Sequence, residues 1–413
     1  MATSIKEALL MKKIEIVSPA GNLEKLRFAV KYGADNIYFG GSDFNLRVQA
    51  DNFTNDDLRE GVELCRQNGV KTTFLLNSYL HEEDIKNAES YIGMISLMGF
   101  DSVMVSDPGM MILLKESGIK ADFHLSTQMN VLNHLAVKFW MDAGFNRIVL
   151  ARETSAEEIK MIKYHTGAEI EVFAHGALCI AYSGRCLLSR YLSGRDANSG
   201  DCSQPCRWKY SLMEEKRPGN YLDIIEHTRG TEILSSKDLC LMDRLEEYID
   251  AGVDAFKIEG RMKSLYHCAN TTRVYKHAVK LAGTLEFNEK MPFWLEELDL
   301  ISHRPYTNDL FNEFGEFGFH GIPYIKKASF AGYRYDGPDA AEEVKVKTFN
   351  PVYKDEIFDG IYPINEKVID DKYRVIKITD DAGNEIGMAR PGTICTIRFD
   401  KPVFADAIFR KRL

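Results

Sequence analysis

The sequence lacks a long hydrophobic run and has no excess of positive charge. No apolar stretch approaches the roughly 20 residues that a membrane-spanning helix needs. The first residues, MATSIKEALLMKKIEIVSPA, show no apolar core followed by a cleavage site. We therefore expect a cytoplasmic protein with no membrane partner. The net charge is −9, from 52 Lys and Arg against 61 Asp and Glu, which argues against a general nucleic-acid binder.

Several common catalytic motifs are also absent. The chain contains no G-x-S-x-G nucleophile turn, no P-loop, and no G-x-G-x-x-G after the first expected strand. His81-Glu82 begins a zinc-protease motif, but Ile85 stands where the second histidine is needed. These absences disfavour serine-hydrolase, P-loop nucleotide, dinucleotide and zinc-protease chemistry.

Only eight cysteines are present, and four of them lie close together. Cys179, Cys186, Cys202 and Cys206 fall within 28 positions, in the spacing C-x6-C-x15-C-x3-C. Cytoplasmic thiols stay reduced, so such a group indicates metal ligands before disulfides. Sites made of thiolates favour zinc or an iron–sulfur cluster, and the spacing leaves both open. Cys240, 34 residues further on, is a fifth candidate thiol.

A recurring phrase predicts alternating helices and strands. YGADNIYFGG, MGFDSVMVSD, AGFNRIVLAR and AGVDAFKIEG each place a glycine before a short β-rich run. The glycines suit a helix C-terminus, and the runs suit strands buried on both faces of a parallel sheet. Eight strands are expected, at Ile14–Val17, Asn36–Phe39, Lys71–Leu76, Ser102–Val105, Ala121–Leu125, Arg147–Leu150, Glu169–Ala174 and Ala255–Ile258. They indicate a TIM-type (β/α)8 barrel over residues 12–285, with an open doubly wound sheet as the rival.

Polar residues follow the expected strands, at the end of a TIM barrel that carries active sites. They are Ser18, Asn77, Asp107, Ser126, Gln128, Arg152, Glu153, His175, Glu259 and Arg261. We expect them to converge on one mouth, although a cap or loop role explains any single one equally well. The segment from His175 to about Ile233 is unusually long and holds all four clustered cysteines, which indicates a functional loop.

The pattern changes towards the C-terminus. Residues 284–323 are rich in aromatic and loop-forming residues, and we expect a linker over 286–325. Short alternating segments such as EEVKVKTFN and KYRVIKITD, separated by turns, predict a small β-barrel over 326–413. This domain is a candidate RNA contact, because it ends in the basic run Arg410-Lys411-Arg412.

The segment EVFAHGALCIAYSGRCLLS carries a family resemblance. It matches the signature E-x-F-x-x-G-[AS]-x-C-x-x-x-x-G-x-C-x-x-S of peptidase family U32, the collagenase-like proteases. SPAGNLEKLRFAVKYGADNIYFGG, VLARETS and FKIEGRMKS also resemble that family. The resemblance implies a [4Fe–4S] cluster held by Cys179, Cys186 and Cys202, with Cys206 as the favoured fourth ligand and Cys240 as its alternative. It also implies prephenate-dependent 5-hydroxylation of the wobble uridine of tRNA.

The polar residues then receive roles as hypotheses. Arg152, Lys257 and Arg261 are expected to bind a small anionic metabolite such as prephenate. Glu153, His175 and Glu259 are candidates for proton transfer, and a salt-bridge network bracing the barrel is the alternative. The expected partner is the tRNA anticodon loop, whose bases are exposed. A collagenase-like peptidase and a non-catalytic iron–sulfur RNA-binding accessory factor are the competing functions, and the oligomeric state is left open.

Overall fold

The first domain is a closed barrel of parallel strands. The computed structural model describes residues 13–46, 52–178, 237–308, 324–337, 339–363 and 370–413, with short stretches at 188–195, 203–205, 212–213, 221–222, 225–227 and 230–232. Within them, eight strands form the barrel: β1 (Glu15–Pro19), β2 (Asn36–Phe39), β3 (Lys71–Leu76), β4 (Ser102–Val105), β5 (Asp122–Leu125), β6 (Arg147–Val149), β7 (Glu169–Ala177) and β13 (Ala255–Ile258). The barrel closes because β13 pairs with both β1 and β7. The predicted TIM-type barrel is confirmed.

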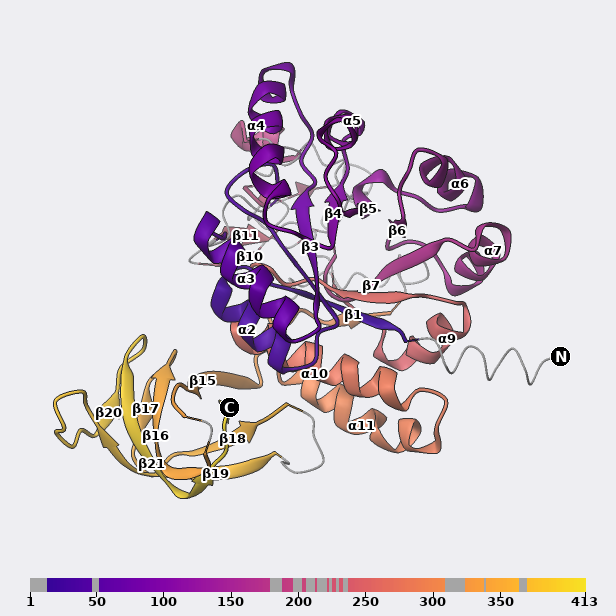
Figure 1. The fold of residues 1–413 in the computed structure, drawn as a ribbon. Helices are drawn as coiled ribbons and strands as arrows, with labels where there is room; N and C mark the ends of the chain where they lie inside the picture. The colour runs from indigo at the N-terminus through magenta and orange to yellow at the C-terminus, as the bar shows by residue number, and fades with distance from the viewer. Residues whose placement is uncertain are drawn as a thin grey trace.

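Helices surround this barrel, as Figure 1 shows. They are α2 (Leu23–Lys31), α3 (Asn55–Gln67), α4 (Ile85–Ser96), α5 (Pro108–Ser117), α6 (His134–Asp142), α7 (Ala156–Thr166) and α10 (Leu265–Leu281). Several begin at a side chain that caps the first turn, as Asn22, Thr54 and Ser155 do. The four predicted helix-ending glycines, at 33, 99, 144 and 252, have φ of 100°, 74°, 101° and 95°. No helix in the described ranges is long and apolar enough to cross a membrane.

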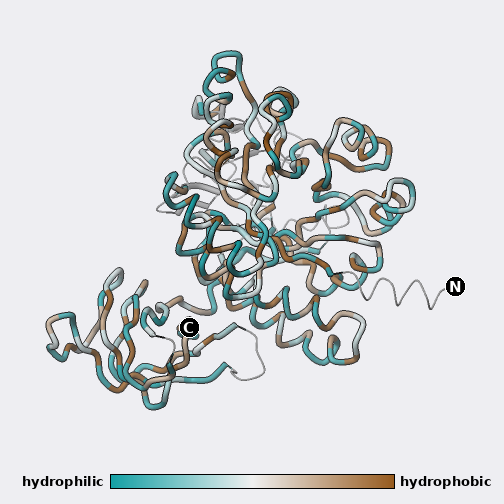
Figure 2. The backbone as a smooth tube through the Cα atoms, viewed as in Figure 1, coloured by the Kyte–Doolittle hydropathy of each residue, from teal (hydrophilic) through white to brown (hydrophobic). Residues whose placement is uncertain are grey.

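The core follows from the strand sequences. β2, β4 and β13 are buried at every position, as expected for strands covered by helices on the outside and by side chains within. Figure 2 shows hydrophobic residues along the barrel strands and mostly hydrophilic ones on the outer turns of the helices. The barrel is therefore held by burial on both sides of each strand.

The chain returns to the barrel after a long excursion. β7 is followed by α8 (Leu188–Ser193) and four short strands, β8 (Leu212–Met213), β9 (Tyr221–Leu222), β10 (Ile225–His227) and β11 (Gly230–Glu232). Strand β12 (Asp238–Cys240) then pairs antiparallel with β7, and β14 (Tyr306–Thr307) extends the sheet beside it. The turn η5 (Met242–Arg244) and helix α9 (Leu245–Asp250) lead on to β13.

The stretch expected as a linker, residues 286–325, contains regular structure. Helix α11 (Leu285–Asp299) occupies its first part and packs beside α10, with Phe287, Trp294 and Leu298 buried. Pro292 lies inside this helix, and aromatic packing offsets the hydrogen bond that a helical proline removes. This part of the chain therefore belongs to the packing of the barrel domain.

The second domain is a small closed β-barrel, as predicted. Its strands run in the order β15 (Ala328–Arg334), β16 (Ala341–Thr348), β21 (Ile394–Val403), β19 (Asp371–Thr379), β18 (Ile357–Ile361) and β22 (Ile408–Arg412), and β22 pairs again with β15. The short strands β17 (Val352–Tyr353) and β20 (Met388–Ala389) pair beside it. It has a hydrophobic core of its own, around Val375, Ile397 and Phe399.

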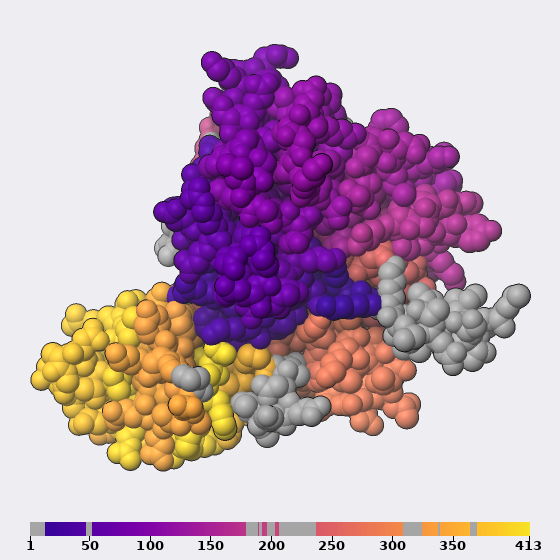
Figure 3. Space-filling model, viewed as in Figure 1, coloured from indigo at the N-terminus to yellow at the C-terminus, as the bar shows by residue number. Residues whose placement is uncertain are grey.

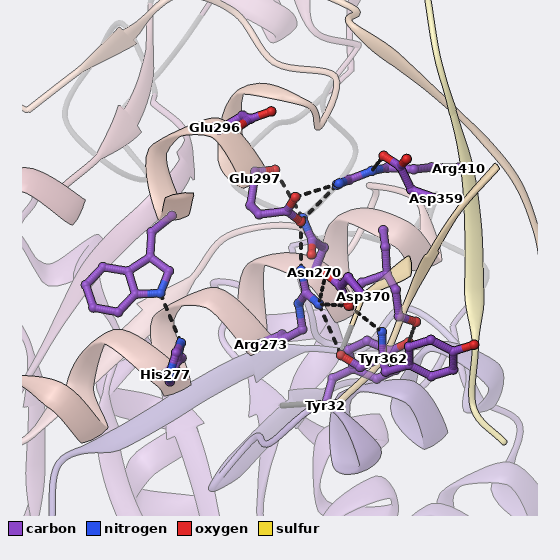
Figure 4. A network of polar contacts seen from close by, with 12 residues as sticks. Tyr32, Asn270, Arg273, His277, Glu296, Glu297, Asp359, Tyr362, Asp370 and Arg410 are labelled. Carbon is purple, nitrogen blue, oxygen red and sulfur yellow. Dashed lines mark hydrogen bonds and ion pairs between the residues drawn. The ribbon is translucent and has the colours of Figure 1, made fainter. Parts of the chain in front are cut away.

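The two domains meet over a buried ionic network. Figure 3 shows the small barrel against the N-terminal part of the chain and the α10–α11 region. Glu297 of α11 binds Arg410 of β22 through both carboxylate oxygens, at 2.5 and 2.9 Å, and binds Arg273 of α10 at 2.7 Å (Figure 4). Arg273 also donates to Asp370 at 2.7 and 2.8 Å, and Arg410 to Asp359 at 3.0 Å. Each guanidinium thus faces acids of both domains.

Removing one cation from this buried network should lower the unfolding free energy more than removing one cation from an exposed ion pair. Arg410→Met leaves Glu297 buried with half of its partners, so we expect a loss of about 3 kcal/mol of unfolding free energy. Arg398→Met is the control, because Arg398 is 53% exposed and forms a surface ion pair with the exposed Glu342. Its loss should stay below about 1 kcal/mol. Urea unfolding measures both, and equal losses would contradict the role given to the network.

Candidate functional site

A chain of alternating charges runs up the inside of the barrel. Arg147, at the start of β6, donates to Glu15 of β1 at 2.7 Å, to Glu171 of β7 at 3.2 Å, and to Glu169. Glu171 in turn accepts from Lys257 Nζ of β13 at 2.8 Å. Glu171 is fully buried, and Arg147 and Lys257 are 2% exposed. The three side chains therefore compensate one another's charge in the barrel interior.

The carboxylate of Glu171 is ionised by its neighbours. Burial alone raises its pKa, but the charges of Lys257 and Arg147 and their hydrogen bonds lower it further than burial raises it. The net shift is downward, so Glu171 keeps its negative charge at neutral pH. His124 of β5 faces the same interior, and its pKa is well below the usual value because of burial and then the charges of Arg147 and Lys257. Its ring is therefore neutral.

Lys257 is the member of this series of buried charges that lies nearest the mouth of the barrel. Its Nζ lies 4.0 Å from the ring centre of Tyr38 and 5.8 Å from that of Phe173. The guanidinium carbon of Arg152 lies 4.0 Å from the centre of the same Phe173 ring. Two of the predicted anion-binding cations thus share one aromatic neighbour, in an arrangement that stabilises positive charge.

The remaining predicted residues occupy the loops around this mouth. Arg261, the third predicted cation, donates to Asn45 at 3.0 Å and to Asn52 at 2.8 Å, which ties the end of β13 to the segment after β2. Glu259 is half-buried, and its backbone N–H donates to the carbonyl of His175 at 2.8 Å. Asp107 caps α5 and accepts from Leu80, so it is a structural residue here.

His175 points away from the mouth, towards α10. Its Nδ1 lies 3.5 Å from the Tyr275 hydroxyl and its Nε2 lies 3.4 Å from the Tyr306 hydroxyl. Burial, followed by the charge of His267, holds its pKa well below the usual value. Ser18 also points outward, with its hydroxyl 2.6 Å from that of Thr272 on α10. These two positions do not join the group of polar residues at the mouth.

Arg152 and Glu153 meet in a pocket on the rim. The pocket has a volume of about 400 Å³ and lies between the β6–α7 connection, β7 and the β12–α9 segment. Phe173, Arg244 and Asn308 also line it. A cation and a carboxylate beside an aromatic ring form a polar pocket suited to a small charged molecule.

Cys179, Cys186, Cys202 and Cys206 lie outside the described residues. Among the described residues, no group of three or more metal-ligating side chains is present. Cys240 is described: its thiol lies 3.8 Å from the Tyr275 hydroxyl, and burial raises its pKa to about 11. The cluster and its ligands remain predictions.

Sequence reasoning missed the centre of the site. The sequence indicates Glu171 only as part of the family signature, and it indicates Arg147 only as the first residue of an expected strand. A charged residue inside an apolar strand run is a detectable signal, because an unpaired charge is rarely buried. The partners of Glu171, which are Arg147 and Lys257, lie 24 and 86 residues away, so the local sequence pattern does not reveal the pairing.

Comparison with known proteins agrees with the barrel and its signature. A model of peptidase family U32 matches residues 21–316. The chain belongs to peptidase family U32. The tRNA hydroxylation protein P1 of Bacillus subtilis (strain 168) is 35% identical over 412 residues, which cover 98% of this chain and 96% of that protein. The tRNA hydroxylation protein P of Escherichia coli (strain K12) is 37% identical and covers 72% of this chain, with 74% of its own length matched.

A relative with a different name is similar to the same degree. The protein named Collagenase from Porphyromonas gingivalis (strain ATCC BAA-308 / W83) is 36% identical over 307 residues, which cover 71% of this chain and 72% of that protein. The family resemblance expected from the sequence is thus confirmed, and family membership alone is compatible with two activities.

Because the buried ring of His124 stays neutral, we expect the unfolding free energy to fall as the pH is lowered. The unfolded chain takes up a proton at this residue below about pH 6.5, whereas the folded protein does not, so the folded state loses about 1.4 kcal/mol per pH unit as the pH falls further. His124→Asn should therefore lose less unfolding free energy than the wild type between pH 7 and pH 5. Urea unfolding at each pH measures this. His165→Asn, at an exposed position of α7, should keep the wild-type slope, and parallel curves for all three proteins would refute the assignment.

Proposed function

We propose that this protein is an enzyme that hydroxylates tRNA at C5 of the wobble uridine, in a prephenate-dependent reaction, and that it holds a [4Fe–4S] cluster. The observation that carries the proposal is the similarity to the tRNA hydroxylation protein P1 over nearly the whole of both chains, including the small β-barrel. A relative that matched the TIM-type barrel alone would say less about the substrate, because one barrel fold hosts many chemistries.

The barrel mouth supports a charged co-substrate. Arg152 follows β6, while Lys257 lies in β13 and Arg261 follows it, and β7 pairs with both of these strands. Prephenate is a dianion that such cations would bind through charge-assisted hydrogen bonds. The negative charge of Glu171 offsets that of Lys257, so Arg152 is the cation best placed for the ligand in the rim pocket. Glu153 lines the same pocket and is the preferred candidate for proton transfer.

The buried histidines speak against hydrolysis by a histidine-activated nucleophile. In the part of the chain that the structure describes, His175 contacts tyrosine hydroxyls, His267 contacts the Glu259 carbonyl, and His303 contacts Asp299 and a backbone carbonyl. No imidazole ring of these three has a serine, threonine or cysteine partner there, and such a pair is the mark of an activated nucleophile.

A [4Fe–4S] cluster would supply electron-transfer or Lewis-acid chemistry near the end of β7. Cys179 follows Leu178 directly, so the first proposed ligand is close in sequence to the pocket-lining Phe173. Cys186, Cys202 and Cys206 complete the favoured set. The anticodon loop is the proposed RNA partner, because its wobble base is already unstacked from a duplex.

Collagenase-like peptidase activity is the second candidate, favoured by the relative that carries the name Collagenase. It would require a nucleophile or an activated water outside the contacts described above. Gelatin cleavage by purified protein that is lost on mutation of one named mouth residue would establish it.

Analysis of tRNA nucleosides from a strain that lacks the gene tests the first proposal. We expect 5-hydroxyuridine derivatives to disappear, to return with the wild-type gene, and to stay absent with Cys186→Ser, since that change removes a proposed cluster ligand. Arg398→Met, at an exposed position on β21 of the small barrel domain, should restore them fully. Unchanged derivatives in the deletion strain would refute the tRNA function.

The fourth ligand can be assigned by paired substitutions. The Cys240 thiol is buried against Tyr275, so we expect Cys240→Ala to keep about four irons per chain after anaerobic purification. Cys206→Ala should lose iron and the brown colour, while Cys395→Ala, in the core of the small barrel, should not. The reverse result for Cys206 and Cys240 would assign Cys240 instead, and a colourless wild-type zinc protein would refute the cluster.

A further inference from the structure

An amide side chain lies at the same end of the barrel as Lys257. Gln128 belongs to the turn η2 (Thr127–Met129) after β5, and it is 2% exposed. Its Oε1 accepts hydrogen bonds from Ser106 at 2.7 Å and from Ser126 at 3.2 Å. Ser106 follows the last residue of β4, and Ser126 follows the last residue of β5. The two serines therefore hold the amide by its oxygen.

The amide faces the barrel interior. Ser106 lies on the same side of β4 as Met104, because alternate residues of a strand share a face. The Met104 sulfur is 3.8 Å from Lys257 Nζ, and β13, which carries Lys257, lies across the barrel from β4 in the strand order. Such a contact passes through the interior, so Ser106 and the Gln128 amide close the interior above Lys257.

The nitrogen of this amide is a donor without an acceptor. Gln128 Nε2 is buried and has no hydrogen-bond partner among the described residues. Because the amide oxygen accepts from both serines, neither N–H group of Nε2 is directed at them. Folded proteins rarely leave a buried donor unpaired, and such a group calls for a specific explanation.

We propose that Gln128 is a ligand-binding residue whose amide N–H donates to an sp2 oxygen of a small molecule at the barrel mouth. That oxygen is a ring carbonyl or a carboxylate, which are the acceptors that a neutral amide donor recognises. The Lys257 ammonium contacts Met104, two residues before Ser106, and has the rings of Tyr38 and Phe173 beside it. These groups would hold a flat, electron-rich or anionic group. The pyrimidine base and the small carboxylate of the proposed function share this chemistry.

The inference rests on the proposed function for the identity of the ligand, and its test measures binding alone. Purified full-length protein is titrated by calorimetry with uridine 5′-monophosphate and, separately, with prephenate. Gln128→Glu replaces the donor by a charged acceptor of the same shape. Gln128→Asn keeps the amide but draws it back by one methylene. Gln67→Glu, exposed on α3, introduces the same charge away from the mouth.

We expect Gln128→Glu to weaken binding of one probe at least tenfold, Gln128→Asn to weaken it by a smaller factor, and Gln67→Glu to leave it unchanged. The probe that loses affinity identifies the source of the oxygen. Melting temperatures show whether the variants are folded. If Gln128→Glu does not fold, the affinity of Gln128→Asn for the two probes is the deciding measurement.

Two results would overturn the inference: a wild-type protein that binds neither probe, or probe affinities that are the same in the wild type and both Gln128 variants. Loss of binding in Gln128→Glu together with unchanged tRNA nucleosides in the deletion strain would uphold this site and refute the RNA function. Unchanged binding in the Gln128 variants together with loss of the tRNA nucleosides in the deletion strain would refute this site and uphold the RNA function. The two proposals can therefore fail separately.

Discussion

The buried carboxylate of Glu171 constrains how this barrel can close. An ionised group in the interior costs several kcal/mol unless it is paired, and here Arg147 reaches it from the lower end of β6 while Lys257 reaches it from β13. These bonds form only when β6, β7 and β13 are in their observed register. The same pairing places the Lys257 ammonium beside the rings of Tyr38 and Phe173. The electrostatics of the site and the closure of the sheet therefore depend on the one side chain of Glu171.

Much of the fold was accessible from the sequence because strands buried on both faces leave a strong local pattern. All eight barrel strands were predicted within about three residues of their bounds, and so was the closed β-barrel at the C-terminal end. Helix α11 was not, because Pro292 and the surrounding aromatic residues indicate a loop locally. Contacts with α10, made only in the folded protein, outweigh that preference.

The site was predictable in position but not in orientation. Arg152 and Gln128 were expected after strand ends and lie there, and Lys257 lies within β13 as its expected strand implies. His175 was expected beside them, because it follows the expected strand Glu169–Ala174. The register of β7 against β13 shifts between Lys257 and Ile258, and such a bulge changes which face a side chain takes. A local pattern cannot reveal a bulge that arises from pairing with a strand more than 80 residues away.

The antiparallel pairing of β12 with β7 has a consequence for how this family can diversify. Ala177 faces Asp238 in the ladder, so the long cysteine-bearing segment leaves and re-enters the barrel at neighbouring points. Lengthening a segment whose ends are already joined costs little free energy. The length and residues of this segment can therefore change during evolution while the barrel strands keep their positions.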